Sequence, residues 1–166
     1  MDLQKFERQV SRKKKKLTQF LAKLDTVIPE DLPALVAEED AAVWTETDCT
    51  TCANCCKTMT PTYSQADIKR IAAHFQLSPK AFFEKYLARD EDSKDIVNRS
   101  QPCPFLEADK CSIYAIRPKD CADFPHHFRR PFDEYNDTYL QNLSRCPATF
   151  RLIDRLQKRV TGEYDF

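Results

Sequence analysis

Four cysteine side chains lie close together in this sequence, in the stretch from Asp48 to Lys57. Their spacing is two overlapping C-x-x-C units followed by an adjacent cysteine, which lets the backbone fold back so that several sulfurs converge on one ion as thiolates. Such soft ligands select zinc, iron-sulfur clusters or copper(I). Further cysteines downstream bring the total to eight, enough for two four-thiolate sites: Cys49, Cys52, Cys55, Cys56, Cys103, Cys111, Cys121 and Cys146.

We predict that all eight cysteines are reduced metal ligands in a compact centre. Cys55 and Cys56 resist binding one ion together because adjacent side chains diverge, so we expect them to serve two sites or to bridge a binuclear one. Cys103 and Cys146 have a plainer alternative role, as small buried apolar residues. No residue is assigned a catalytic role.

Other side chains near the cysteines carry weaker signals. We expect His126 and His127 to be packing or surface residues, because eight thiols already fill two sites. Tyr114 and Arg117 are candidates for hydrogen bonds that tune a thiolate site, or equally are ordinary core and surface residues.

The identity of the metal is open on spacing alone. A structural zinc site takes four ligands in a tetrahedron, which C-x-x-C pairs provide. A 4Fe-4S cluster also takes four thiolates, and Cys49, Cys52 and Cys55 match the first three ligands of the bacterial ferredoxin run. Gly162 is the only glycine. This lack of small residues to wrap a bulky cluster favours zinc, with iron or a 4Fe-4S cluster as the alternative cofactor.

Composition excludes several other functions. At 166 residues the chain has the size of one ordinary domain, so the cysteines are not needed merely to hold it together. Lysine plus arginine and aspartate plus glutamate balance at 26 each, so no net charge attracts nucleic acid or an anionic membrane. The near absence of glycine argues against any phosphate-binding glycine loop.

The start of the chain indicates its compartment. Residues 1–8 carry charge where a signal peptide needs an apolar run, and no stretch approaches a membrane span in length. We therefore expect a cytoplasmic protein without a membrane partner. Thiols stay reduced in the cytoplasm, so metal binding is favoured over a disulfide framework.

Apolar residues at helical spacing dominate the elements that must position the cysteines. The extended pieces are short, and the segments 103–106 and 111–114 are joined by a turn at 107–110, which predicts a β-hairpin. The fold class is therefore mainly α, a small helical domain with a short β-hairpin organised around a cysteine-rich metal centre. We expect a helical extension over 1–44 and a metal-binding domain over 45–166. The predicted helices are 3–25, 34–44, 65–75, 79–87, one turn around Cys121, 132–143 and 147–160.

These cysteines sit in motifs that resemble a known family, the bacterial YkgJ-type cysteine-cluster proteins, described as a zinc- or iron-chelating domain with the motif C-x-x-C-x-x-C-C. The resemblance covers roughly residues 45–155, and it implies metal binding much more strongly than any reaction. One departure is Ala122, where the family usually has arginine, so a cation beside Cys121 is not carried over. The matching elements are the opening cluster, Cys103-Pro104-Phe105-Leu106, Cys111-Ser112-Ile113-Tyr114, Arg117-Pro118, Cys121 with Phe124-Pro125, and Cys146.

Three functions are compatible with these patterns. The first is a metal-binding protein whose thiolate sites are structural or serve metal handling, without catalysis of its own. The second is an enzyme component or electron carrier with an iron-sulfur cluster. The third is an interaction module of the zinc-finger kind, for which the balanced charge argues against nucleic acid as the partner. The sequence identifies no protein partner.

Overall fold

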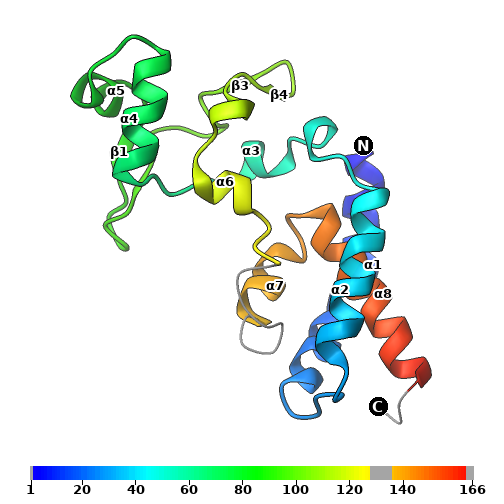
Figure 1. Ribbon diagram of the computed structural model, residues 1–166. Coiled ribbons are helices and arrows are strands. Elements are labelled where there is room, and N and C mark those ends of the chain that lie inside the picture. Colours follow the sequence, from blue (N-terminus) through cyan, green and yellow to red (C-terminus); the bar gives the residue numbers. More distant parts are fainter. Residues whose placement is uncertain (1, 128–135, 164–166) are drawn as a thin grey trace. The chain divides into compact units, whose positions relative to one another are not determined.

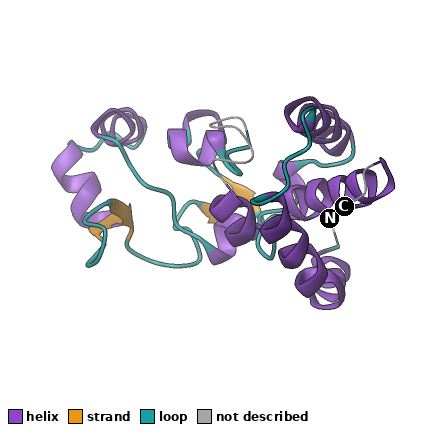
Figure 2. Ribbon diagram, turned by 90° about the horizontal axis from the view of Figure 1, so that it is seen from below, coloured by secondary structure: helices purple, strands orange, loops and turns teal. Residues whose placement is uncertain are grey.

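A computed structural model of the protein describes residues 2–127 and 136–163 (Figure 1). The chain forms two compact units. The first unit is Met1–Asp48 with Pro125–Phe166, and the second unit is Cys49–Phe124. The prediction of a mainly α fold with a small hairpin is confirmed, since helices predominate and the strands are short (Figure 2). The expected domain division, 1–44 and 45–166, stays a prediction.

The first unit is built from long helices that bury apolar faces. Helices α1 (Leu3–Leu24) and α2 (Leu32–Thr45) both pack against α8 (Pro147–Glu163), and the short α7 (Asn136–Asn142) contacts α1 and α8. The Asp2 side chain caps α1 by accepting a hydrogen bond from the Lys5 backbone N–H at 2.9 Å. Its buried core includes Phe6, Val10, Leu17, Phe20, Leu21, Leu24, Leu35, Val43, Leu152, Ile153, Leu156 and Val160.

Buried charge also ties α2 to α8 within this core. The Glu39 carboxylate accepts hydrogen bonds from Arg155 and from Arg159, the latter at 3.2 Å. Burial alone would raise the pKa of Glu39, but the two arginines outweigh it and hold that pKa below its usual value. The first unit thus combines apolar packing with paired charges.

The second unit is built from short elements. Its longest helices are α4 (Gln65–His74) and α5 (Pro79–Tyr86), which pack together. Ser64 caps α4 in a capping box with Asp67, and Ser78 caps α5 ahead of Pro79. The remaining elements are η1 (Cys49–Thr51), α3 (Asn54–Thr58), β1 (Leu87–Arg89), β2 (Ile96–Asn98), β3 (Leu106–Glu107), β4 (Lys110–Cys111), η2 (Tyr114–Ile116) and α6 (Lys119–Asp123).

An aromatic stack forms the centre of the second unit's core. The rings of Phe82 and Phe105 are nearly parallel, with centroids 6.1 Å apart, and Phe75 stacks on both. Phe105 lies two residues after Cys103, so this core reaches the cysteine-bearing segments directly. The buried members are Tyr63, Ile68, Ile71, Ala72, Phe82, Leu87, Phe105 and Ile113.

The predicted hairpin is present as β3 and β4, which pair antiparallel with Leu106 opposite Cys111. Its two-residue turn has positive φ at both positions, 47° at Ala108 and 62° at Asp109. Two-residue hairpin turns of this kind match the right-handed strand twist, and they usually carry asparagine or glycine. Here the turn forms without either residue.

Two local expectations differ from the structure, and a third lies partly outside the described residues. Residues after Cys111 were expected to be extended, but Tyr114–Ile116 forms a 3₁₀ turn. The helix expected over 79–87 ends at Tyr86, because Leu87 begins a strand that pairs with β2. Residues 132–135 of the helix expected over 132–143 lie outside the described residues, and α7 covers the remainder to Asn142.

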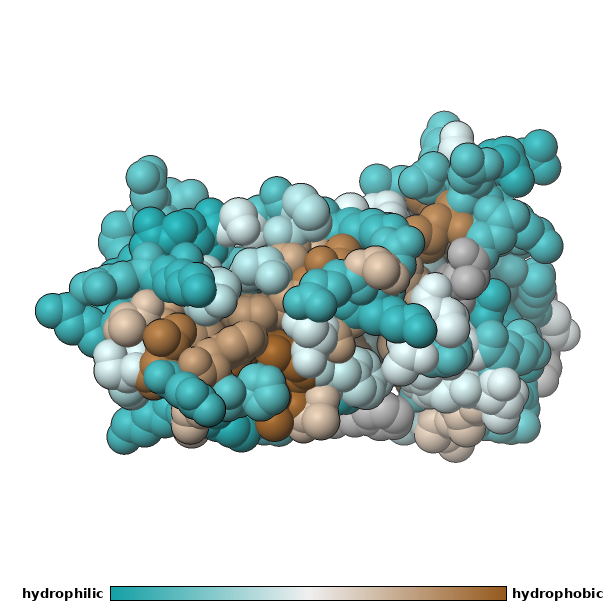
Figure 3. All heavy atoms as spheres, turned by 90° about the horizontal axis from the view of Figure 1, so that it is seen from above, coloured by the Kyte–Doolittle hydropathy of each residue, from teal (hydrophilic) through white to brown (hydrophobic). Residues whose placement is uncertain are grey.

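One face of the molecule is largely polar (Figure 3). Figure 3 shows a face covered mainly by hydrophilic side chains with hydrophobic ones between them, consistent with a mean hydropathy of −0.62. Over residues 2–127 and 136–163, no helix has both the length and the apolar character needed to cross a membrane.

Candidate metal centre

The C-x-x-C-x-x-C-C segment folds as two successive turns. In η1 the Cys52 backbone N–H donates to the Cys49 carbonyl at 3.2 Å. Ala53 then takes the left-handed conformation, with φ of 54°, and α3 begins at the next residue. This reversal places Cys55 and Cys56 on a new helical turn.

Two later cysteines are held close to this segment by the backbone. The Cys103 N–H donates to the Cys56 carbonyl at 2.8 Å, so the loop before β3 lies against α3. Strand β4, which ends at Cys111, contacts η1. Both side chains are half-buried against the aromatic core.

Four of the thiols interact electrostatically with one another. Burial, and then the neighbouring cysteines, raise the pKa values of Cys103, Cys111 and Cys121 above the ordinary thiol value. Cys56 acts on all three, and Cys103 and Cys111 also act on Cys121. Like charges raise one another's pKa in this way only when they are near each other. We call Cys56, Cys103, Cys111 and Cys121 the thiol cluster.

Cys56 is the member of the thiol cluster that ionises most readily. A hydrogen bond from the Cys55 thiol lowers the pKa of Cys56 to about 7, against the opposing effect of burial. Its own backbone N–H acts in the same direction. A thiol with such a pKa is substantially a thiolate at neutral pH, the form that binds metal.

The four side chains of the thiol cluster do not converge on a single ion-binding position. Across the part of the chain that the structure describes, no three histidine, cysteine, aspartate or glutamate side chains lie close enough together to hold an ion. Bringing the four thiolates to bonding distance therefore requires side-chain movement. The donor set itself fits a soft ion, because it consists of sulfurs whose mutual repulsion a cation would relieve.

The remaining predicted ligands lie in different surroundings. Cys49 is exposed, while Cys52 and Cys55 are half-buried, all three in the second unit. Cys146 is buried in the first unit just before α8, where its N–H donates to the Asn142 carbonyl at 2.8 Å. All eight cysteines are thiols rather than disulfides.

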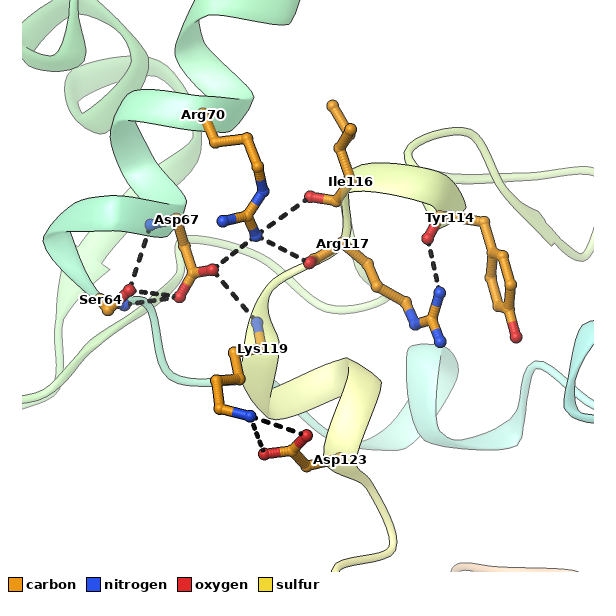
Figure 4. Close-up of polar contacts among 8 residues, drawn as sticks. All are labelled: Ser64, Asp67, Arg70, Tyr114, Ile116, Arg117, Lys119 and Asp123. Carbon is orange, nitrogen blue, oxygen red and sulfur yellow. Dashed lines mark hydrogen bonds and ion pairs between the residues drawn. The ribbon is translucent and has the colours of Figure 1, made fainter.

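Asp67 fixes the segment that carries Cys121, a role that the sequence did not reveal (Figure 4). Besides closing the capping box with Ser64, its carboxylate accepts from the Arg70 guanidinium at 2.6 Å and from the Lys119 backbone N–H at 3.2 Å. Burial alone would raise the pKa of Asp67, but these hydrogen bonds hold it below its usual value. Arg70 also donates to the Arg117 carbonyl at 3.0 Å, so α4 anchors the entrance to α6.

Tyr114 and Arg117 form a local pair. The Arg117 guanidinium lies 3.9 Å from the centroid of the Tyr114 ring and donates to the Tyr114 carbonyl at 2.7 Å (Figure 4). Its charge opposes the rise in the pKa of Cys111, which is due first to burial. Arg117 is thus a cation acting on the thiol cluster, and the acceptor of its hydrogen bond to Tyr114 is a backbone oxygen.

Tyr63 and Asn98 form a buried hydrogen bond beside the thiol cluster, which the sequence did not reveal. The buried Tyr63 hydroxyl donates to Asn98 Oδ1 at 2.6 Å. Burial, and then Cys103, Cys121 and Cys111, raise the pKa of Tyr63. The phenol therefore lies beside three members of the thiol cluster.

The first unit holds a buried Asp-His-Thr chain of contacts. His127 Nδ1 donates to Asp40 Oδ1 at 2.6 Å, and Nε2 lies 2.9 Å from Thr149 Oγ1. The Thr149 side chain is 0% exposed, so its hydroxyl cannot meet a substrate. Trp44 also donates to Asp40, and the Tyr139 ring stacks on His127 at 5.2 Å. His127 is therefore a packing residue, as expected.

Comparison with known protein families matches residues 48–147 to the CxxCxxCC family, described as "Putative zinc- or iron-chelating domain". The chain belongs to this family. All eight cysteines lie within the matched residues. Membership assigns metal binding to the chain in general terms, consistent with its donor set. No solved structure matches the chain significantly.

Proposed function

We propose that this protein binds zinc through thiolates and that the thiol cluster is the principal site. The observation that carries the proposal is that Cys56, Cys103, Cys111 and Cys121 come from separate segments and yet lie near enough for Cys56 to raise the pKa of the other three. Ionising four neighbouring thiols is unfavourable without a cation, whereas a divalent cation bound among them makes the thiolate form favourable. A bound metal ion would thus balance the negative charge of these thiolates.

Four thiolates complete a tetrahedron and leave no open position, which supports a structural or metal-handling role over catalysis. When bound, zinc would cross-link α3, β4, α6 and the loop before β3. The scaffold prepares this arrangement through the Cys103–Cys56 backbone hydrogen bond and the anchoring of α6 by Asp67. The other predicted ligands, Cys49, Cys52, Cys55 and Cys146, stay candidates on the basis of their sequence spacing.

An iron-sulfur cluster is the second candidate. The Cys49, Cys52 and Cys55 spacing favours it, since three ligands of the bacterial ferredoxin run have this spacing. In that case the protein would be an electron carrier or an enzyme component. Hydrogen bonds and burial around the sulfurs would then set the reduction potential.

Metal analysis of protein purified without oxygen distinguishes the two candidates. The zinc proposal predicts a colourless protein with about one to two zinc ions per chain. A brown protein with iron and sulfide and an absorption band near 400 nm or so would establish the alternative instead. Protein that retains neither metal, and takes up neither when reduced and supplied with it, would contradict both.

A further inference from the structure

A buried amide N–H lies next to the thiol cluster without an acceptor. The Asn98 side chain belongs to β2, and the residue is only 7% exposed. Within the described part of the chain its Nδ2 atom makes no hydrogen bond. A buried donor without a partner is destabilising, so such a group calls for a specific explanation.

Three contacts hold Asn98 in one orientation. Its backbone N–H donates to Thr60 Oγ1 at 2.9 Å, and the residue pairs with Leu87 across the β1–β2 ladder. The Tyr63 hydroxyl donates to Oδ1 at 2.6 Å. Since Oδ1 accepts from the phenol, Nδ2 of the same amide points away from Tyr63.

The Asn98 side chain lies close enough to the Cys103 thiol to act on its pKa. Burial raises the pKa of the Cys103 thiol, and the Asn98 side chain opposes that rise as a hydrogen-bond donor would. A neutral thiol is a weak acceptor, whereas a thiolate accepts N–H hydrogen bonds strongly. The donor is therefore placed for a sulfur that carries negative charge.

We propose that Asn98 Nδ2–H donates a hydrogen bond to the Cys103 sulfur when that sulfur is a metal-bound thiolate, with Tyr63 as the residue that positions the amide. This inference rests on the proposed function of the thiol cluster. The hydrogen bond withdraws electron density from the sulfur and holds Cys103 in place for the metal. Asparagine suits the role because a neutral donor brings no further charge into the buried site.

Cobalt(II) bound to the full-length reduced protein is a suitable probe, because thiolate-to-cobalt absorption reports electron density on sulfur. The decisive variant is Tyr63→Phe combined with Asn98→Leu. It replaces donor and acceptor together by apolar side chains of similar shape, a change that costs little stability. We expect its cobalt affinity to fall about 10-fold. This is the lower end of the range seen when a residue that hydrogen-bonds to a metal ligand is removed. The charge-transfer band should move to longer wavelength, and metal-bound Cys103 should be alkylated faster.

A matched control removes a comparable pair from the first unit. Gln157 Nε2 donates to Thr161 Oγ1 at 3.1 Å on α8, so Gln157→Leu with Thr161→Val deletes an amide–hydroxyl pair. Its band position, cobalt affinity and Cys103 alkylation rate should match those of the wild type. Tyr63→Phe alone should change all three readouts in the same direction as the decisive variant but by less, and it decides the question if the double variant does not fold.

The outcomes separate this inference from the function on which it rests. If the wild type binds cobalt, and the Tyr63 and Asn98 variants show the same band, affinity and alkylation rate, Asn98 is not a donor to the thiolate and only this inference fails. If the wild type binds neither cobalt nor zinc, both the inference and the proposed function are overturned. A red-shifted band in the variants but not in the control supports the assignment.

Discussion

The two compact units are stabilised in different ways. The first unit packs long amphipathic helices around an apolar core and adds partly buried ion pairs such as Glu39 with Arg155. The second unit has short helices and strands of two or three residues around a small aromatic core. Short elements bury little apolar surface, and small domains of this kind are usually reinforced by a metal or disulfides.

This difference suggests that only the second unit depends on metal. Its segments are separated in sequence by loops, and the thiol cluster is where α3, β4 and α6 converge. A metal ion that binds these thiolates stabilises the folded arrangement, because the unfolded chain has no preformed site.

Cys121→Ser should have the largest effect of any single substitution. Serine is a poor donor to a soft ion, so one metal should be lost and the second unit should lose several kcal/mol of stability, out of about 10 kcal/mol that a structural zinc contributes. Metal stoichiometry and thermal melting measure the two losses together. Cys49→Ser is the control, since Cys49 is exposed and outside the thiol cluster. An equal loss in the control would remove the distinction between the thiol cluster and the other cysteines.

Asp67→Asn should destabilise the second unit by about 2–3 kcal/mol, the usual range for charged hydrogen bonds of a buried group. The amide retains one acceptor oxygen but turns its N–H groups either toward Arg70 and the Lys119 N–H or toward Ser64. Chemical denaturation followed by a probe in this unit measures the change. Glu84→Gln, in an exposed ion pair with Lys80 on α5, should cost less than about 1 kcal/mol.

The same carboxylate gives a pH dependence. The folded pKa of Asp67 is depressed below the unfolded value of about 3.9, so its stabilisation is complete above that value. It is lost as the pH falls through the folded pKa. Asp67→Asn should therefore flatten the acid limb of the stability curve of the second unit. An unchanged acid limb would show that Asp67 does not titrate with folding.

Glu39→Gln tests the first unit and should cost about 1–2 kcal/mol, because the buried group keeps an acceptor but loses its charge against two arginines. Metal content should not change. Glu38→Gln is matched to it, since Glu38 pairs with Arg159 at 2.8 Å but is 65% exposed and should cost less than about 1 kcal/mol. Loss of metal from the Glu39 variant would contradict the separation of the two units' stabilities.

Local patterns made much of the fold predictable. The capping residues Ser64 and Ser78 and the apolar spacing of α1 are features of adjacent residues, so the helices that they begin or define could be read directly. The end of α5 could not, because Leu87 continues the helical spacing and only its pairing with Asn98 makes it a strand. Non-local pairing overrides local preference here.

The candidate ligands were predictable because cysteine has few other uses at such spacing, but their supporting residues were not. Asp67 reaches Lys119 and Tyr63 reaches Asn98 across long stretches of chain, and neither pair leaves a periodic trace in the sequence. The sequence also gave no sign that Cys146 belongs to a different compact unit from the other seven cysteines.

Amide hydrogen exchange, compared between the zinc-loaded protein and the chelated, reduced protein, shows which unit the metal stabilises. Removal of zinc is expected to abolish protection in α4, α5 and the β1–β2 pair of the second unit, while α1, α2 and α8 of the first unit keep most of theirs. Chelated protein in which the second unit keeps full protection, or in which both units lose it equally, would contradict the claim that metal binding stabilises the second unit in particular.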